Sequence, residues 1–395
     1  REPEAVKSKG SVVKSKVMVQ IADRRIEEDE HEVPPIGPHE ALLRVEACGL
    51  CGSDVEQFRG TMAAAGIMRY PVIPGHEPIG RIAELGVEAA RNWNVKEGDR
   101  VALEPHLSCG RCELCLRGDY HNCRSLMPPG APPCYGYTPR DVGHGLWGGY
   151  SQYIHLHERT MLHKVPDTMP LALATLYQPL AAGIRWAVQV PRTTLGDTVL
   201  ILGSGQRGLG AVVAAREVGA SAIILTGTSR SKYKLRMAEA LGAHHTIEAD
   251  HEDIVARVMA ITDGRGVDVV LDTVPVAMEP VLDAVAVARI GGTIVLGGIK
   301  GSSGAINLDV DRVLYKELII KGVYSQAREA YVEAFRMLAE NKYRLDRLHT
   351  NEYPLTSAEE AILTLGREYN SHEQPICVSL HPDLATMTAG GTVRI

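Results

Sequence analysis

The stretch Val199–Gly210, VLILGSGQRGLG, decides the fold class of this chain. Its first four residues are all apolar, which is typical of a buried strand in a parallel sheet. Three glycines follow with the spacing Gly203-x-Gly205-x-x-Gly208, and the next residues predict a helix that ends at Gly219. In this strand–turn–helix context the spacing predicts a dinucleotide site. Gly203 permits a tight turn, Gly205 lets a pyrophosphate approach the backbone, and Gly208 lets helix and strand pack closely.

Strands and helices continue to alternate after this turn. Short apolar runs at 222–227, 244–247, 267–274 and 293–299 predict strands, and the segments between them have helical patterns. Strands that alternate with helices imply a parallel sheet with right-handed crossovers, so we expect an α/β fold. We place this unit at residues 187–325.

The bulk composition limits the classes of partner. The 395 residues are 45% hydrophobic and 23% charged, and the net charge of −6 comes without a long block of like charge. This predicts a globular protein with a large core and argues against a nucleic-acid or membrane-surface partner. No apolar run approaches the roughly 18 residues of a membrane span. Residues 1–16 are polar and basic, unlike a secretory signal, so we expect a cytoplasmic protein.

Four of the eight cysteines lie close together, as C-x2-C-x2-C-x7-C in the segment 107–124. In a large chain without a signal peptide, this clustering indicates metal rather than disulfides. Four thiolates close a tetrahedral zinc site and leave no position for substrate, so we predict a structural zinc there. An iron–sulfur cluster is the alternative, and His121 is a further candidate ligand. The predicted ligands are Cys109, Cys112, Cys115 and Cys123.

A second metal site is predicted from two glycine-flanked motifs, GLCGSD with Cys51 and PGHEPIG with His76 and Glu77. Thiolate, imidazole and carboxylate are all zinc ligands, and a site with three protein ligands keeps a position open for water or substrate. The alternative is that Cys51 is a buried thiol and His76 an ordinary turn histidine.

The segment 127–149 is rich in Pro and Gly and has no clear periodicity. Long irregular loops in compact domains are often functional, so this segment is a candidate for the substrate mouth. A packed surface loop is the equally simple alternative. The aromatic candidates in it are Tyr135, Tyr137, His144 and Trp147.

Together, GLCGSD, PGHEPIG, the four cysteines, LGSGQRGLG and the helix near the carboxyl end resemble the zinc-dependent medium-chain alcohol dehydrogenases. The resemblance covers almost the whole chain and is greatest to the sorbitol, butanediol and threonine dehydrogenase-like branch. It implies a GroES-like, mostly-β catalytic domain and a Rossmann coenzyme domain with a doubly wound parallel sheet. The active site would lie between them, in a homodimer or homotetramer. We place the domains at 1–186 and 187–325, with 326–395 rejoining the first.

The resemblance implies roles for individual residues. Cys51 and His76 would hold the catalytic zinc, with Glu77 as a ligand or an exchangeable partner. Ser53 would take the proton of the substrate hydroxyl. Gln178 stands in YQPLAAG, where family members often have Glu or Cys, so the third ligand is left open between Glu77, Gln178 and water.

The proton route is also left open, because Glu56 stands where the family often has a relay histidine. Gln178 and Trp147 are in addition candidates for lining the substrate site.

The coenzyme end of the predicted site lacks an expected carboxylate. An NAD site usually has an acidic residue about 20 residues past the glycines, but none occurs between Glu217 and Glu239. Cations and hydroxyls occur there instead, and they would suit a 2′-phosphate. We therefore expect NADP(H) in preference to NAD(H). The alternative is that these cations form only the solvated face of a helix. The predicted coenzyme-binding residues are Gly203, Gly205, Gln206, Arg207, Gly208, Gly227, Thr228, Ser229, Arg230 and Lys234.

The function expected from these features is reversible hydride transfer between a secondary alcohol or polyol and NAD(P)+, which gives a ketone or aldehyde. Two alternatives on the same fold are a zinc-free enone or quinone reductase and a non-catalytic NADPH-binding protein. A zinc lyase that keeps the coenzyme only as a scaffold is a further one.

Overall fold

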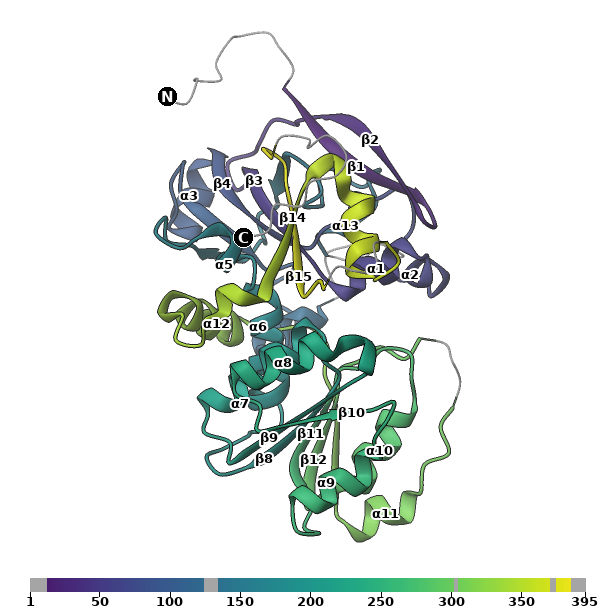
Figure 1. The fold of residues 1–395 in the computed structure, drawn as a ribbon. Coiled ribbons are helices and arrows are strands. Elements are labelled where there is room, and N and C mark those ends of the chain that lie inside the picture. The colour runs from purple at the N-terminus through teal and green to yellow at the C-terminus, as the bar shows by residue number, and fades with distance from the viewer. Residues whose placement is uncertain (1–12, 124–133, 302–304, 370–373, 385–395) are drawn as a thin grey trace.

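The computed structural model describes residues 13–123, 134–301, 305–369 and 374–384. One of its two large sheets has six parallel strands in the order β10-β9-β8-β11-β12-β13, with β8 at its centre (Figure 1). This order places the first strand beside the fourth, as in doubly wound nucleotide-binding sheets. The strands are β8 (Thr198–Leu202), β9 (Ala222–Gly227), β10 (His245–Glu248), β11 (Val267–Asp272), β12 (Ala288–Leu296) and β13 (Ile319–Gly322).

The central strand β8 is buried on both faces, which explains its uninterrupted apolar run. Val199 and Ile201 pack in one core, whereas Leu200 and Leu202 pack in the core on the other side of the sheet. Helices cover both faces: α7 (Gln206–Glu217), α8 (Lys232–Leu241), α9 (Ile254–Ile261), α10 (Glu279–Val287) and α11 (Val310–Tyr315). The predicted α/β fold is confirmed.

The second large sheet is mostly antiparallel and is assembled from both ends of the chain. Its strands run in the order β14-β15-β3-β4-β5-β7, and β6 also pairs with β3. The carboxyl-terminal strands therefore lie in the same sheet as the amino-terminal ones (Figure 1). The strands are β3 (Ala41–Leu50), β4 (Glu77–Leu85), β5 (Arg100–Leu103), β6 (Tyr153–Leu156), β7 (Leu162–Lys164), β14 (His349–Pro354) and β15 (Cys377–His381).

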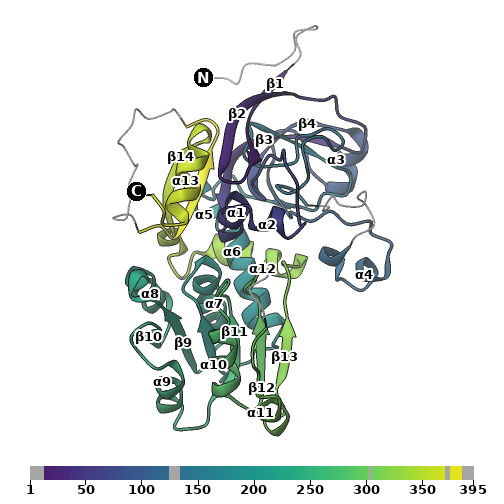
Figure 2. The ribbon, with the colours of Figure 1, turned by 90° about the vertical axis from the view of Figure 1, so that its right-hand side faces the viewer.

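Short helices surround this sheet: α1 (Gly52–Phe58), α2 (Thr61–Ala64), α3 (Val87–Trp93), α4 (Glu113–Leu116) and α13 (Ala358–Leu365). The lobe that carries α4 stands out from the body of the molecule (Figure 2). In the described residues, no helix has both the length and the apolarity that a membrane crossing requires.

A strand without an apolar pattern precedes this sheet in the chain. The charged stretch Arg25–Glu32 is β2, which pairs with β1 (Lys14–Ala22) as an antiparallel hairpin. Its side chains are mostly exposed, so no apolar alternation marks it. Backbone pairing holds it instead, with ion pairs across the hairpin such as Lys14–Glu30 at 2.8 Å.

Helices α5 (Leu171–Ala174), α6 (Tyr177–Ile184) and α12 (Arg328–Glu340) lie where the two sheets meet (Figure 1). Two residues, Thr175 and Leu176, separate α5 from α6. Pro179 stands in the first turn of α6, where a backbone N–H has no partner within the helix. A Cβ on Gly183 would lie 2.3 Å from the Gly210 carbonyl carbon, so α6 and α7 touch backbone to backbone.

Candidate active site

Cys51 follows the last residue of β3 and is the N-cap of α1. Its backbone N–H donates to Asp54 Oδ2 at 2.7 Å, so the third residue of the helix holds the start of the turn. This local structure fixes the position of the Cys51 thiol at the end of a strand.

His76 and Glu77 come to the same place through strand pairing. Glu77 is the first residue of β4 and pairs with Gly49 of β3, close to Cys51. The preceding Gly75 has φ +92°, and a Cβ there would lie 2.4 Å from the Tyr150 ring, so only glycine fits the turn. Antiparallel pairing of β3 with β4 thus brings together residues that are far apart in the sequence.

The side chains of Cys51, His76 and Glu77 converge in the interior. One ligand atom from each lies within 4.8 Å of the others, and all three residues are buried. His76 Nε2 is 3.8 Å from Glu77 Oε1, and on the other side of the ring Nδ1 is 3.5 Å from Asp54 Oδ1. An imidazole with one nitrogen in the cluster and the other beside a carboxylate is the arrangement of metal-ligating histidines. The donor set fits zinc with an open position.

Electrostatics in this cluster favour a thiolate. Burial raises the pKa of the Cys51 thiol, but Arg207 and His76 outweigh that effect and bring it to about 6. Arg207 Nη2 donates to Cys51 Sγ at 3.1 Å. Burial also raises the pKa of Glu77, and the charge of Cys51 adds to this, because two negative groups share one interior site.

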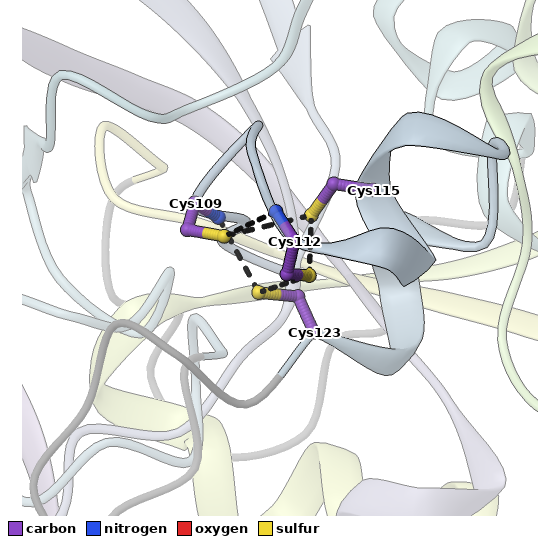
Figure 3. Close-up of side chains that lie close together, drawn as sticks. All are labelled: Cys109, Cys112, Cys115 and Cys123. Atoms are coloured by element: carbon purple, nitrogen blue, oxygen red, sulfur yellow. Dashed lines mark hydrogen bonds between the residues drawn. The ribbon is translucent and has the colours of Figure 1, made fainter.

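The four remaining predicted ligands form a separate cluster in the α4 lobe (Figure 3). The Sγ atoms of Cys109 and Cys115 are 3.9 Å apart, and Cys112 Sγ lies 3.4 Å from Cys115 Sγ and 3.9 Å from Cys123 Sγ. A tetrahedral zinc with 2.3 Å bonds places its sulfurs about 3.8 Å apart, so the four thiols fit that ion. His121 is not in this cluster, and its Nε2 contacts Asn122 and Arg185.

The glycine turn after β8, residues 203–208, is called the coenzyme turn here. Its backbone has the shape that dinucleotide phosphates need. Gly203 has φ +104°, and a Cβ on Gly208 would lie 2.0 Å from the Gly203 carbonyl oxygen. By contrast, nothing lies within 4 Å of a Cβ built on Gly205, so the backbone is open there. The turn faces the other sheet, because Gln206 Nε2 donates to the Leu50 carbonyl at 2.9 Å. The coenzyme turn and the Cys51 cluster therefore adjoin each other.

Comparison with known proteins agrees with this geometry. The family model of the alcohol dehydrogenase GroES-like domain matches residues 37–167, and that of the zinc-binding dehydrogenase domain matches residues 208–340. The chain belongs to the zinc-dependent medium-chain alcohol dehydrogenase family.

Known proteins and solved structures resemble this dehydrogenase over most of its length. It is 38% identical over 363 residues to the "probable alcohol dehydrogenase" of Mycobacterium tuberculosis, covering 91% of this chain and 96% of the relative. Sorbitol dehydrogenase of Bacillus subtilis is 32% identical, with 88% and 92% covered. Among solved structures, an alcohol dehydrogenase of Thermotoga maritima has a TM-score of 0.81 at 26% identity, covering 94% of this chain and all of that one. A zinc-binding dehydrogenase from Sinorhizobium meliloti, solved with NADP bound, has a TM-score of 0.80 at 27% identity, with the same coverage.

Gln178 lies beside the cluster with both ends of its amide engaged. Its Nε2 donates to the His76 carbonyl at 3.2 Å, and its Oε1 accepts from the Tyr331 hydroxyl at 2.9 Å. The amide therefore links the backbone of one zinc-site residue to α12. The Tyr331 hydroxyl uses one of the two acceptor positions of the amide oxygen, and Glu77 is the carboxylate that lies with Cys51 and His76 in the cluster.

Ser53 lies at the rim of the dehydrogenase site. Its Oγ is 3.3 Å from His76 Nε2, and the side chain is partly exposed. Glu56 does not continue a proton route from Ser53. Its carboxylate accepts from Arg59 at 2.8 Å and from Thr61 at 3.0 Å, and these contacts turn it toward the surface.

The predicted substrate-mouth aromatics separate into two groups. Tyr137 reaches the cluster, with its hydroxyl 3.5 Å from His76 Nδ1. Trp147 does not: it is 4% exposed in a core of the catalytic sheet, its ring 3.9 Å from that of His144 and 5.8 Å from that of Tyr135. Placing Trp147 at a substrate mouth is therefore corrected, because packing of the loop onto the sheet buries the indole. Residues 127–133 of the predicted loop lie outside the described residues.

The cations predicted to bind a 2′-phosphate lie near the end of β9. An acidic residue that the sequence did not lead us to expect there, Asp250, lies beside them. Arg230 and Thr228 are exposed, while burial and the nearby Arg367 lower the pKa of Lys234 to about 8. Arg367 arrives from the carboxyl-terminal part of the chain and donates to Ser231 Oγ at 3.1 Å. Ser229 is engaged by Asp250, which accepts its backbone N–H at 2.7 Å.

Several residues of the site were missed by sequence reasoning. Asp54 had a local signal, because it stands three residues after Cys51, the spacing of a capping box. Trp186, Asp250 and Arg367 had none, since only the folded chain brings them to the glycine turn and to β9. Arg207 was assigned to the coenzyme, but the structure places its side chain on Cys51 and over the Trp186 ring at 4.8 Å.

Proposed function

We propose that this dehydrogenase transfers hydride reversibly between a secondary alcohol or polyol and NADP+, which gives a ketone or aldehyde. The observation that carries the proposal is the convergence of Cys51, His76 and Glu77 beside the coenzyme turn. Hydride transfer needs the donor carbon and the nicotinamide ring held in contact, and a site between the two sheets supports that alignment.

Each side chain of the cluster has a proposed part. A zinc ion held by Cys51, His76 and Glu77 would act as a Lewis acid that favours ionisation of the substrate hydroxyl. Ser53 Oγ would accept the hydroxyl proton and pass its own proton to solvent water, since it lies at the partly exposed rim of the cluster. Asp54 would orient the His76 ring through Nδ1.

The preference for NADP(H) rests on cations at the end of β9. Arg230 forms no ion pair among the residues that the structure describes, and Arg367 adds a second guanidinium to those predicted. Because Asp250 engages Ser229, the proposed 2′-phosphate site depends on Arg230, Arg367 and Lys234. The NADP bound to the Sinorhizobium meliloti protein supports this choice.

We also propose a cytoplasmic homodimer or homotetramer. Strand β13 is an edge of the parallel sheet, and large apolar side chains are exposed on it and on the preceding helix. These side chains are Leu314, Tyr315, Ile319 and Ile320. None of the eight cysteines forms a disulfide, which is consistent with a reducing compartment. Light scattering of the purified protein tests the assembly.

The activity is tested with a panel of secondary alcohols, polyols and ketones, each assayed with NAD(H) and NADP(H). We expect chelator-sensitive turnover of secondary alcohols that is faster with NADP+. Cys51→Ser should abolish it, whereas Cys134→Ser, at a thiol outside both cysteine clusters, should not. Full activity after removal of the weaker-bound metal would contradict the proposal.

A further inference from the structure

Arg207 is the second residue of α7, yet its side chain leaves the coenzyme turn and reaches the other domain. Nη2 donates to Cys51 Sγ at 3.1 Å, and the guanidinium carbon lies 4.8 Å from the centre of the Trp186 ring. A planar cation held by one hydrogen bond and a stacked indole has a fixed position and orientation.

The charge of this guanidinium has no dedicated partner. Among the described residues, Arg207 makes no ion pair with a carboxylate, and the negative groups near it are Cys51 and Glu77. Both of those negative groups belong to the predicted metal site, where a bound zinc would share their charge. A guanidinium has five N–H donors, and the hydrogen bond to Cys51 uses only one nitrogen. The guanidinium is partly buried, and its remaining N–H groups could pair with an oxyanion of a ligand.

We propose that Arg207 receives a carboxylate of the substrate, so that the preferred substrate is a short hydroxy acid rather than a neutral alcohol. This inference rests on the proposed dehydrogenase function and narrows its substrate class. The donors of Arg207 adjoin a ligand of the proposed zinc site, so a carboxylate a few bonds from the carbinol carbon reaches them while its hydroxyl lies at the cluster. Bidentate pairing of guanidinium with carboxylate gives both orientation and affinity.

The coenzyme pyrophosphate is the other oxyanion that could meet Arg207. The open backbone at Gly205 offers the pyrophosphate a site at the start of α7, whereas the Arg207 side chain points to Cys51. This geometry favours the substrate carboxylate, and measuring the affinity for NADPH separates the two sources.

The test compares two matched substrate pairs, lactate with 2-propanol and 3-hydroxybutyrate with 2-butanol, in the wild-type holoenzyme and in Arg207→Met. We expect kcat/KM of the wild type to favour the acids, and we expect Arg207→Met to lower it about 10- to 100-fold more for the acids than for the neutral alcohols, whose own loss reports the effect on the Cys51 thiolate. Arg207→Lys should keep part of the preference. The matched control is Arg216→Met, which removes an arginine from the same helix at its contact with Tyr343 and should leave the ratio unchanged.

Two binding measurements make the outcomes decisive. NADPH affinity, measured by fluorescence, should stay within about threefold in Arg207→Met; a loss confined to NADPH binding would assign Arg207 to the coenzyme and overturn the proposal.

Calorimetry with butyrate, an unreactive carboxylate, should show binding to the wild type that Arg207→Met loses. Equal loss for acids and neutral alcohols, or no preference for acids in the wild type, also overturns it. Arg207-dependent butyrate binding without turnover of any alcohol would sustain the anion site and refute the proposed dehydrogenase function instead.

Discussion

At the scale of single residues, the site depends on groups that hold the ligands rather than on the ligands alone. The His76 ring has Asp54 beside one nitrogen and the cluster at the other, while Gln178 holds the His76 carbonyl. GLCGSD and PGHEPIG predict that Cys51, His76 and Glu77 act together; the structure brings them together, and their part as metal ligands stays a prediction. The contact of Gln178 with Tyr331 was not predictable, because 153 positions separate the two residues in the chain.

Asp54→Asn should weaken binding at the catalytic metal site. An amide keeps the shape and still accepts the Cys51 N–H, but it loses the charge beside His76 Nδ1. We expect the affinity for zinc to fall about 10- to 100-fold, measured by competition with a chelator. The control is Glu56→Gln on the same helix, whose carboxylate accepts from Arg59 and Thr61. Equal affinity in Asp54→Asn and wild type would refute the orienting role.

Gln178→Leu distinguishes a supporting amide from a metal ligand. It leaves the His76 carbonyl and the Tyr331 hydroxyl without these partners in a buried place, so stability should fall by about 1–3 kcal/mol. Zinc content should remain at two ions per chain. Urea unfolding and metal analysis measure the two effects, with Tyr331→Phe as the control that removes the hydroxyl shared by Gln178 and Gln326 but leaves the Gln178 amide in place. Loss of one zinc from Gln178→Leu, as expected for Glu77→Ala, would show that Gln178 is a ligand.

At the scale of elements, the strand, turn and helix around Val199–Gly210 were predictable because every local signal agrees there. The glycines have distinct structural reasons: positive φ at Gly203, open space at Gly205 and backbone contact at Gly208. The hairpin strand Arg25–Glu32 was not predictable from apolar periodicity, because its charged side chains are mostly exposed. The acid Asp250 was also missed, since it reaches Ser229 only through the pairing of β9 with β10.

A pair of glycine substitutions tests the coenzyme turn. Gly205→Ala meets nothing within 4 Å and has φ −70°, so stability should stay within about 1 kcal/mol of wild type while NADPH affinity falls tenfold or more. Gly208→Ala places a Cβ 2.0 Å from a carbonyl oxygen and should cost about 1–3 kcal/mol or more. Thermal unfolding and fluorescence titration measure both. Unchanged NADPH affinity in Gly205→Ala would contradict a pyrophosphate site there.

Glu217, the last residue of α7, fixes that helix to α12 and the segment after it. Tyr343, Lys342 and Arg336 donate to its carboxylate and lower its pKa to about 2, from an ordinary 4.5. The unfolded chain therefore takes up the proton first as pH falls. The contribution to stability is complete well above pH 4.5 and is lost as pH falls toward 2.

We expect Glu217→Gln to lower the free energy of unfolding at pH 7 by about 1–3 kcal/mol, below the full value of the pKa shift because the carboxylate is partly solvated. The difference from wild type should shrink between pH 5 and pH 3 in urea unfolding. Glu333→Gln removes a more exposed partner of Arg336 and should cost less than about 0.5 kcal/mol. A difference that is constant with pH would exclude the ion-pair explanation.

At the scale of the whole molecule, function depends on how two sheets meet. The carboxyl-terminal strands return to the amino-terminal sheet, and α12 packs on α6, so the chain passes the junction more than once. Gln206 and Arg207 extend from the coenzyme turn to Leu50 and Cys51 across that junction. The sequence predicts the Cys51 cluster and the coenzyme turn separately. How the two fit together depends on packing between helices, which no local sequence pattern encodes.

The measurement that tests the account most directly is an anomalous difference map at the zinc edge, from crystals of the enzyme grown with NADPH. We predict two peaks per chain: one bonded to Cys51 Sγ, His76 Nε2 and a Glu77 oxygen, with the nicotinamide ring beside it, and one among the four cysteines of the α4 lobe. A map with the lobe peak alone, or with the second peak far from the nicotinamide, would contradict the account.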